Sequence, residues 1–473
     1  MPDASTQHTN GSVPLNSAAA KNSAKLRFWP LVIATFFMVS GGTYGTEDIV
    51  HGAGYGRAIL ILLLTPVIWS LPTAFMIGEL SSALPKEGGY YAWVRRAMGN
   101  CWGFQEAWLS LAASVFDMAI YPTLFVVYLE RLFPWFAVGH RGLFVGLAVV
   151  AGCAALNIAG IKVVSTTSLW LFWLLSAPFA AIVVLAPFKY GPLAHAVTTP
   201  VTTHVGIMGG LLVAMWNYMG WDNASTIAEE VDRPQRTYPR AMIGAVILVA
   251  ASYILPVAAM SLTHLSPSVW ETGSWADIAG LVGGPLLRIG LVLGGMMSAF
   301  GMFNALVLSY SRLPYAMAQD GILPNVFARV NRRKMPWISI VVLATGWGLC
   351  LGLGFEHLVT IDVLVYGGSL LLEFIALAVL RVTEPDLPRP FKVPGGLFGA
   401  VLVGVVPMLL LVFSVVRGDR EQILGMSSFV FALIVVLAGF LAYGIDLSLR
   451  RARRLQTASS GPDKNAGATA DME

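Results

Sequence analysis

The fold is decided by Ser40-Gly41-Gly42-Thr43-Tyr44-Gly45-Thr46-Glu47-Asp48, which interrupts the first long apolar segment of the chain. A second interruption falls in the sixth apolar segment and reads Trp216-Asn217-Tyr218-Met219-Gly220-Trp221-Asp222-Asn223. A helix that breaks inside a bilayer exposes backbone N–H and C=O groups that lipid cannot satisfy, so such backbone persists only inside protein or beside a cavity. Breaks at corresponding positions of two halves point to the binding site of a transporter.

The composition is that of a membrane protein. Of the 473 residues, 56% are hydrophobic and 12% are charged, whereas soluble domains carry about 25% charged residues. The sequence therefore predicts an all-α polytopic membrane protein, and the lack of strand-like alternation excludes a β-barrel. The stretches long enough to cross about 30 Å of hydrocarbon number twelve: 28–53, 57–83, 100–131, 141–159, 163–187, 206–229, 238–262, 283–318, 336–355, 357–381, 396–416 and 425–449.

The basic residues predict the orientation. If both termini are cytoplasmic, 23 of the 30 lysines and arginines fall inside and seven fall outside, which satisfies the positive-inside rule. We therefore expect a multi-pass protein of the cell membrane with both termini in the cytoplasm. The basic run from Arg329 to Lys334 is interpreted as a topological anchor, not as a nucleic-acid site. The polar ends, 1–27 and 450–473, are predicted to be disordered tails.

The two breaks lie five spans apart. A repeated unit with an odd number of spans places its second copy upside down in the membrane, which makes an inverted repeat. We expect 28–187 to form the first repeat and 206–381 the second, with discontinuous helices 1 and 6. The remaining two spans, 396–449, lie outside the pair.

Small and acidic residues in the breaks are candidates for the site. Gly41, Gly42 and Gly45 permit positive φ and close approach of a ligand. Glu47 and Asp222 each start a half-helix after a break, where an acid either caps the helix or binds substrate, and both roles can coexist. An acid there uses the positive helix end that would otherwise hold a substrate carboxylate, so a cationic substrate group is favoured.

Asp117 lies near the middle of the stretch 100–131, away from any break that it could cap. A carboxyl at this depth is costly and is by default a candidate functional group. The alternative is an acid that only locks the helix bundle. Tyr121 follows by one turn and faces the same side. Other polar or aromatic residues that could reach the same cavity are Tyr44, Asn217, Trp221, Ser298 and Asn304.

Signatures of enzymes are missing. The chain has no phosphate-binding loop, no G-x-S-x-G motif and no His/Cys cluster with metal spacing. We therefore expect no enzyme activity, no cofactor and no metal. Glu79 and Glu106, nearer the predicted cytoplasmic ends of their spans, are interpreted as gate contacts or as structural contacts between helices, with the structural role favoured.

The motifs resemble those of the amino acid–polyamine–organocation superfamily along almost the whole membrane region. The general marks are the Gly-Gly break, Pro85-Lys86-Glu87-Gly88-Gly89-Tyr90 before span three, and Ala228-Glu229-Glu230-Val231-Asp232-Arg233-Pro234 closing span six. A narrower resemblance is to the L-type branch with the plant-type polyamine uptake transporters and their bacterial relatives. Its marks are the whole first break, Gly103 to Trp108, Asp117 with Tyr121-Pro122, Trp216-Asn217 with Trp221-Asp222, Leu372 to Ala376 and Arg389 to Pro394.

The resemblance implies a twelve-span, five-plus-five inverted-repeat transporter whose spans one, three, six and eight line the site. It implies substrate contacts for Gly41, Gly42, Gly45, Glu47, Asp117, Trp221 and Asp222. Two departures stand out. The middle of span five has no lysine to replace a sodium ion, and Thr43 stands where many branch members carry proline.

We therefore expect a secondary active transporter of amino acids or polyamines that works by alternating access and is coupled to protons. The acids at mid-depth favour polyamines. The alternatives are an amino acid exchanger and a transporter-like receptor that binds without cycling. The expected partners are the small-molecule substrate, H+ and the lipid bilayer, with no nucleic acid and no obligate partner subunit.

Overall fold

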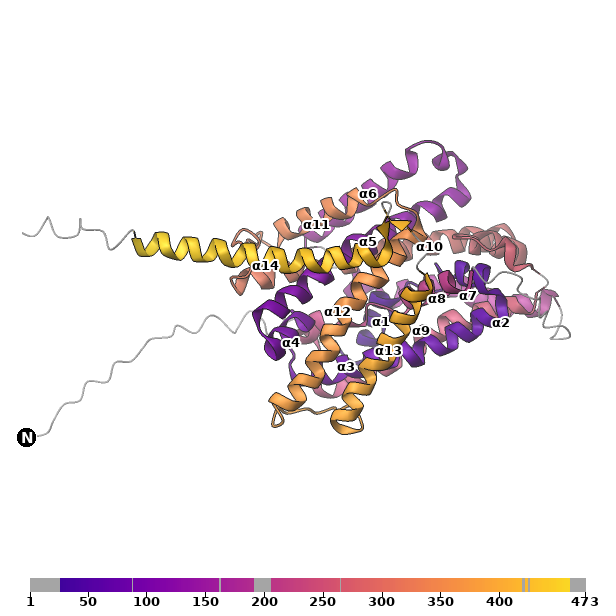
Figure 1. Cartoon of the computed structure of the whole chain (residues 1–473). Coiled ribbons are helices and arrows are strands. Elements are labelled where there is room, and N and C mark those ends of the chain that lie inside the picture. The colour runs from indigo at the N-terminus through magenta and orange to yellow at the C-terminus, as the bar shows by residue number, and fades with distance from the viewer. Residues whose placement is uncertain are drawn as a thin grey trace, which may run out of the picture.

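The computed structural model (Figure 1) describes residues 26–459 except 87, 161–162, 191–205, 264, 419–421 and 424–425. The described residues are almost entirely helical, as predicted. The one sheet among them is an antiparallel hairpin of two strands with two residues each, β1 (Gln422–Ile423) and β2 (Met426–Ser427). The long elements are α1 (Phe28–Val39), α2 (Glu47–Thr65), α3 (Leu71–Ala83), α4 (Gly89–Met98), α5 (Asn100–Leu132), α6 (Arg141–Ile158), α7 (Val163–Tyr190), α8 (Gly206–Asn217), α9 (Pro234–Ser261), α10 (Trp275–Gln319), α11 (Trp337–Leu349), α12 (Phe355–Thr383), α13 (Gly396–Gly418) and α14 (Ser428–Ser459).

The helices have the length and composition of membrane spans. Nine stretches within the described residues are long and apolar enough to cross a membrane, and α1 and α11 are shorter apolar helices. The chain is therefore a multi-pass helical membrane protein. The number of twelve spans and the inverted repeat stay predictions.

The first predicted break is confirmed. α1 ends at Val39 and α2 begins at Glu47, with non-helical backbone between them. α2 then changes direction at Gly54, where φ is 71° and ψ is 162°. Gly54 therefore separates the end of predicted span one from the start of span two, which continues through the π-turn η1 (Pro66–Ser70) into α3.

The second predicted break is confirmed as well. α8 ends at Asn217, and the chain resumes at Trp221 as the 3-10 helix η3 (Trp221–Glu230). Gly220 lies between them with a φ of 82°. A Cβ at Gly220 would stand 2.9 Å from the carbonyl oxygen of Met38, at the end of α1, so the close approach of the two breaks requires glycine here.

Two predicted limits were wrong. α11 ends at Leu349, six residues before the predicted limit, and Gly352 has a φ of 107° that no helix accommodates. α14 continues to Ser459, ten residues beyond the predicted limit, because residues 450–459 include four arginines and two alanines, which are strong helix formers. The tail residues 1–25 and 460–473 lie outside the described residues.

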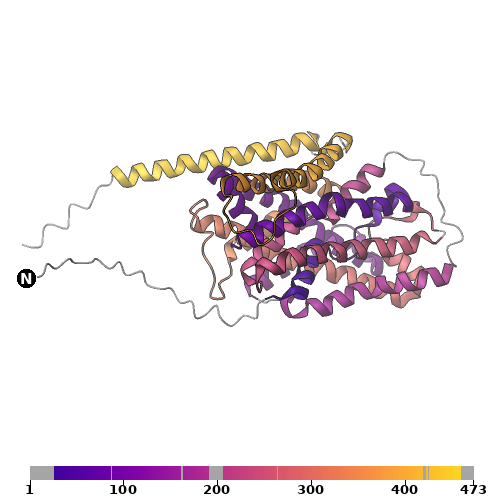
Figure 2. The same cartoon turned by 90° about the horizontal axis from the view of Figure 1, so that it is seen from below.

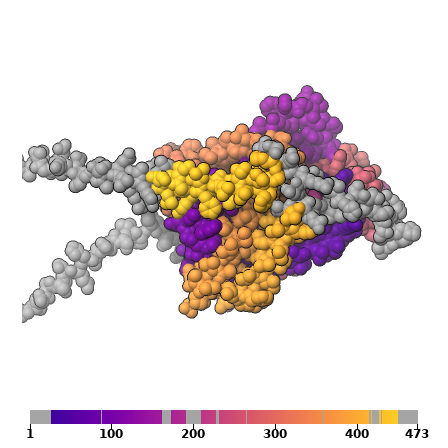
Figure 3. All heavy atoms as spheres, in the orientation of Figure 1, coloured from indigo at the N-terminus to yellow at the C-terminus, as the bar shows by residue number. Residues whose placement is uncertain are grey.

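α5, α10 and α12 form the centre of the bundle. α5 packs against both α10 and α12, and α2 packs against α8. α13 packs on α12 and α3, whereas α14 runs along the outside of α5 and projects beyond the bundle (Figures 2 and 3). Trp108 of α5 donates from its indole nitrogen to the carbonyl of Val435 in α14 over 2.9 Å. This arrangement places Asp117, in the middle of α5, beside both breaks.

Candidate functional site

Side chains satisfy the backbone of the two breaks. Ser298 Oγ of α10 donates to the Gly41 carbonyl over 2.5 Å, and Tyr253 of α9 donates to the Asn217 carbonyl over 2.8 Å. The side-chain Nδ2 of Asn217 donates to the Gly45 carbonyl over 3.3 Å, so a residue of the second break binds the backbone of the first. Irregular backbone inside a membrane protein requires such partners.

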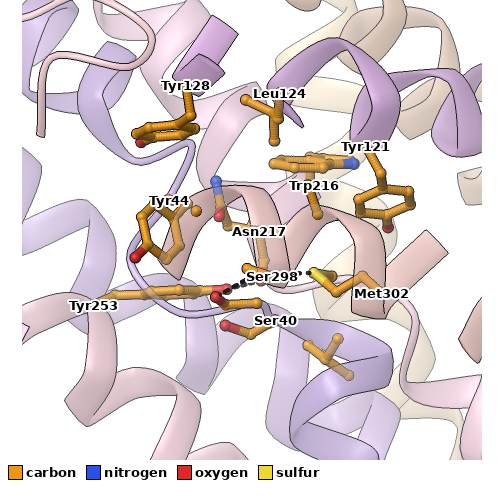
Figure 4. Close-up of a pocket in the computed structure, with 14 residues that line it drawn as sticks. Ser40, Tyr44, Tyr121, Leu124, Tyr128, Trp216, Asn217, Tyr253, Ser298 and Met302 are labelled. Atoms are coloured by element: carbon orange, nitrogen blue, oxygen red, sulfur yellow. Dashed lines mark hydrogen bonds between the residues drawn. The ribbon is translucent and has the colours of Figure 1, made fainter. Parts of the chain in front are cut away.

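A small cavity of about 20 Å³ lies against both breaks. Five aromatic side chains surround it, from α5, α8, α9 and the first break, so we name it the aromatic cavity (Figure 4). The polar groups at its wall come from Ser40, Asn217 and Ser298. The five rings belong to Tyr44, Tyr121, Tyr128, Trp216 and Tyr253.

A second cavity of about 20 Å³ adjoins the first and shares Val39, Tyr121 and Trp216 with it. Two carboxyl groups line it, from Asp117 and Asp362, so we name it the acidic cavity. The rings of Tyr121 and Trp216 stand between the cavities, with centroids 6.3 Å apart. Among the described residues, those that line the two cavities include no lysine, arginine or histidine.

Asp117 is held by three aromatic donors. Its Oδ1 accepts from Tyr121 over 2.9 Å and from the Trp216 indole over 3.3 Å, and its Oδ2 accepts from Tyr310 over 3.3 Å. No arginine or lysine is among these partners, so the carboxyl can still accept a cationic ligand. The opposite acid, Asp362, has one buried oxygen without a hydrogen-bond partner.

Asp222 lies just beyond the acidic cavity. Its Oδ1 accepts from Tyr366 over 2.6 Å, and the Tyr366 ring is part of the cavity wall. Asp222 is thus connected to the cavity through one tyrosine and does not line it.

Glu47 closes one end of the site. Its Oε1 accepts from Tyr128 over 2.5 Å and from the Gly273 backbone over 3.0 Å. The neighbouring Asp48 accepts from Thr272 over 2.9 Å. The structure places Glu47 between the first break and the 271–274 loop, outside the lining of both cavities.

Other predicted residues are not brought to the cavity wall. Gly42 and Gly45 shape the break with φ of 93° and 86°. The Trp221 indole donates to the Tyr218 carbonyl over 2.8 Å. Asn304 faces α6, where its Oδ1 accepts from Asn157 over 2.9 Å. The predicted residues that do line a cavity are Gly41, Tyr44, Asp117, Tyr121, Asn217 and Ser298.

Several lining residues were missed by the sequence reasoning. Asp362 carried the same signal as Asp117, because it is a lone acid between apolar residues inside a predicted span. Tyr128 continues the face of Asp117 and Tyr121, seven residues beyond Tyr121. Tyr253, Tyr310 and Tyr366 had no such signal, since a tyrosine in a span is more often packing.

A cavity between two broken helices, in a bundle of membrane-length helices, is the arrangement typical of a membrane transporter's binding site. Comparison with known proteins identifies the family. The sequence matches the amino acid permease family over residues 32–441, and the chain belongs to that family. The predicted superfamily is thereby confirmed, and the protein is a transporter and not an enzyme.

Three relatives illustrate the similarity. A probable polyamine transporter of Arabidopsis thaliana is 34% identical over 433 residues, which cover 90% of this chain and 88% of the relative. A polyamine transporter of Oryza sativa subsp. japonica is 36% identical over 383 residues, 81% of this chain and 72% of the relative. A serine/threonine exchanger of Bacillus subtilis is 24% identical over 434 residues, 87% of this chain and 94% of the relative.

Proposed function

We propose that this protein is a secondary transporter that moves polyamines across the cell membrane by alternating access, coupled to protons. The proposal includes the twelve spans, the inverted repeat and cytoplasmic termini. The Gly54 turn then lies at the outer side, and α4 lies at the inner side.

The charge of the cavity wall carries the proposal. Asp117 and Asp362 face the acidic cavity, and no cationic side chain lines either cavity. A polyamine presents only ammonium groups and methylenes, so its charges match this wall. A zwitterionic amino acid also presents a carboxylate, which would lie beside the two acids without a cationic partner.

The aromatic cavity suits the rest of such a ligand. Ammonium groups bind over tyrosine and tryptophan rings, with about 0.5–2 kcal/mol per contact, and methylenes gain from contact with the same surfaces. The ring of Trp216 lies near those of Tyr121 and Phe355. When the site opens, a linear diamine can therefore place one ammonium at Asp117 and its chain among the rings.

Contacts at both ends of the site support alternating access. At the proposed outer end, Glu47 binds the loop at Gly273. At the proposed inner end, Tyr91 donates to Asp320 over 2.9 Å and Arg95 forms an ion pair with the same carboxylate. The conformation is thus closed toward both sides, and opening either end requires a different set of contacts to break.

The similarity to a serine/threonine exchanger supports a second candidate, which is exchange of amino acids. Uptake by purified protein in liposomes separates the two. Radiolabelled putrescine and spermidine are compared with leucine and arginine, with empty liposomes as the blank. We expect saturable polyamine uptake that leucine does not reduce. Saturable leucine transport without competition by polyamines would establish the exchanger instead.

A further inference from the structure

A second pair of buried carboxyl groups lies outside the cavities. Glu106 of α5 and Glu373 of α12 are both fully buried. Neither lines the aromatic or the acidic cavity. The transport of a polyamine through the cavities does not account for them.

The two glutamates belong to matching motifs on neighbouring helices. Glu106 and Ser110 are four residues apart on α5, and Ser369 and Glu373 are four residues apart on α12, so each pair shares a helix face. The two serine hydroxyls are 2.8 Å apart, and Ser369 donates to Glu106 Oε1 over 2.5 Å. Ser110 also donates to Glu106 Oε1 over 3.3 Å.

The acceptor capacity of this pair is unused. Glu106 Oε2 and both carboxyl oxygens of Glu373 are buried without a hydrogen-bond partner. Two ionised carboxylates in this state would each carry a large desolvation cost and would repel one another. A proton bound to either carboxyl removes one charge and adds a hydrogen-bond donor to the pair.

The surroundings offer no competing cation. The ionisable groups that interact with the pair are Asp222 of η3 and Tyr90 of α4, with Tyr366 of α12 also beside Glu373. The next basic residue along α12 is Arg381, which is already bound to Glu79 over 2.5 Å. Every group in this list is neutral, acidic or already paired.

The pair is connected to the acidic cavity along one face of α12. Asp362, Tyr366, Ser369 and Glu373 follow at spacings of four, three and four residues, which place them on one stripe of the helix. Asp362 and Tyr366 line the acidic cavity, and Tyr366 binds Asp222. The stripe leads from the cavity toward the proposed cytoplasmic end.

We infer that Glu106 and Glu373 form an intramembrane proton-binding site that couples the transport of substrate to a proton gradient. This inference rests on the proposed function. When the site is loaded, one carboxylate accepts a proton that enters from the outer side and becomes a carboxylic acid. When the inner side opens, the acid returns the proton to cytoplasmic water and the carboxylate is restored.

The ligand of this site is a proton and not the second ammonium of a polyamine. An ammonium needs space for its hydrogens and its methylene chain, and neither cavity reaches the two glutamates. A proton needs only a carboxyl oxygen to bind, and three oxygens of the pair are buried without a partner.

The test uses full-length protein in liposomes with radiolabelled spermidine and the variants Glu106→Gln and Glu373→Gln. Glutamine has the shape of the protonated acid but cannot release the proton. We expect both variants to retain spermidine counterflow at equal pH on both sides. We expect them to lose accumulation driven by an acid-outside gradient, which for one proton per substrate reaches about tenfold per pH unit in the wild type. Asp386→Asn, an exposed acid after α12, is the matched control and should behave as wild type.

The outcomes separate the two proposals. Absence of spermidine counterflow in the wild type would refute the polyamine function itself. Counterflow together with normal gradient-driven accumulation in both variants would overturn the proton site. A variant with weaker spermidine affinity and intact gradient coupling would overturn it in favour of an ammonium site.

A variant that keeps both carboxyl groups tests the inference even if the two glutamine variants fail to fold. Ser369→Ala removes a donor to the Glu106 carboxylate and should favour the protonated form, so the pH midpoint of gradient-driven uptake should move upward. An unchanged midpoint in folded Ser369→Ala protein would contradict the inference.

Discussion

At the scale of single residues, Asp117 carries the most weight because its ring donors hold it at the wall of the acidic cavity. Its partners are neutral: Tyr121, Trp216 and Tyr310. The carboxylate therefore keeps its charge available for a ligand while its position is fixed.

Asp117→Asn should weaken spermidine binding about ten- to a hundredfold, since a hydrogen bond to a charged group contributes about 1.5–3 kcal/mol. Scintillation proximity binding to purified protein measures this loss, and the apparent melting temperature reports folding. Asp386→Asn is the control. Wild-type affinity in Asp117→Asn would reduce this residue to a structural role.

Gly41 is the second residue whose role can be tested. A Cβ at this position would overlap Ser298 Oγ and Met302 Sδ of α10. Gly41→Ala should push the first break away from α10 and strongly reduce spermidine uptake. The exposed Gly56, where a Cβ meets nothing within 4 Å, provides the control Gly56→Ala. Equal uptake by both variants would contradict this account.

At the scale of elements, Glu79 joins three parts of the chain. Its carboxylate binds Arg381 of α12, Arg389 of the following loop and the Val393 backbone, while Glu79 itself lies on α3. The glutamate is fully buried, and the exposed fractions of the arginine side chains are 9% and 4%. The interpretation of Glu79 as a structural contact between helices agrees with these contacts.

Glu79→Gln should lower the free energy of unfolding by about 3–5 kcal/mol, because it leaves buried arginines without their counter-charge. Thermal unfolding in detergent measures the effect. The control is Glu384→Gln at the partly exposed pair with Arg96, where the expected loss is about 0–1 kcal/mol. A similar melting temperature for both variants would show that burial gives the Glu79 pair no special importance.

The Arg96–Glu384 pair should depend on pH. Hydrogen bonds of 2.8 and 2.7 Å from the Arg96 guanidinium lower the pKa of the Glu384 carboxyl below its usual value. The pair therefore stabilises the protein fully above the unfolded pKa, about 4.3, and loses this contribution as pH falls through the folded pKa. Comparing Glu384→Gln with wild type across pH 3–7 checks this, and a constant difference would contradict it.

At the scale of the whole molecule, the proposed orientation places both termini and α4 in the cytoplasm. Cysteine labelling in intact cells tests it, in a background without Cys101, Cys153 and Cys350. A membrane-impermeant maleimide should label Ser268→Cys in intact cells but label Asn325→Cys only after permeabilisation. Both positions are exposed. The reverse pattern would invert the topology.

The sequence predicted those features of the fold that are energetically unfavourable in lipid. Glycines and polar residues inside apolar spans mark the breaks, and Asp117 stands out by depth. The same reasoning applied to Asp362 would have found the second acid of the cavity. Asn304 and Trp221 were placed at the site by proximity in sequence, but the direction of a side chain on its helix depends on packing that no local pattern encodes.

The cavity tyrosines could not be predicted for a related reason. Tyr253 and Tyr310 resemble packing residues until the fold brings their hydroxyls to the Asn217 carbonyl and to Asp117. The premature end of α11 and the extension of α14 show a similar limit, because hydropathy marks the apolar interval and not the helix itself.

The most direct test of the central claim is equilibrium binding of radiolabelled spermidine to the purified protein, with unlabelled putrescine and leucine as competitors. We predict saturable binding that putrescine displaces, that leucine does not displace, and that Asp117→Asn abolishes or strongly weakens. Displacement by leucine, or unaltered spermidine binding in Asp117→Asn, would contradict a polyamine site built on the acidic cavity.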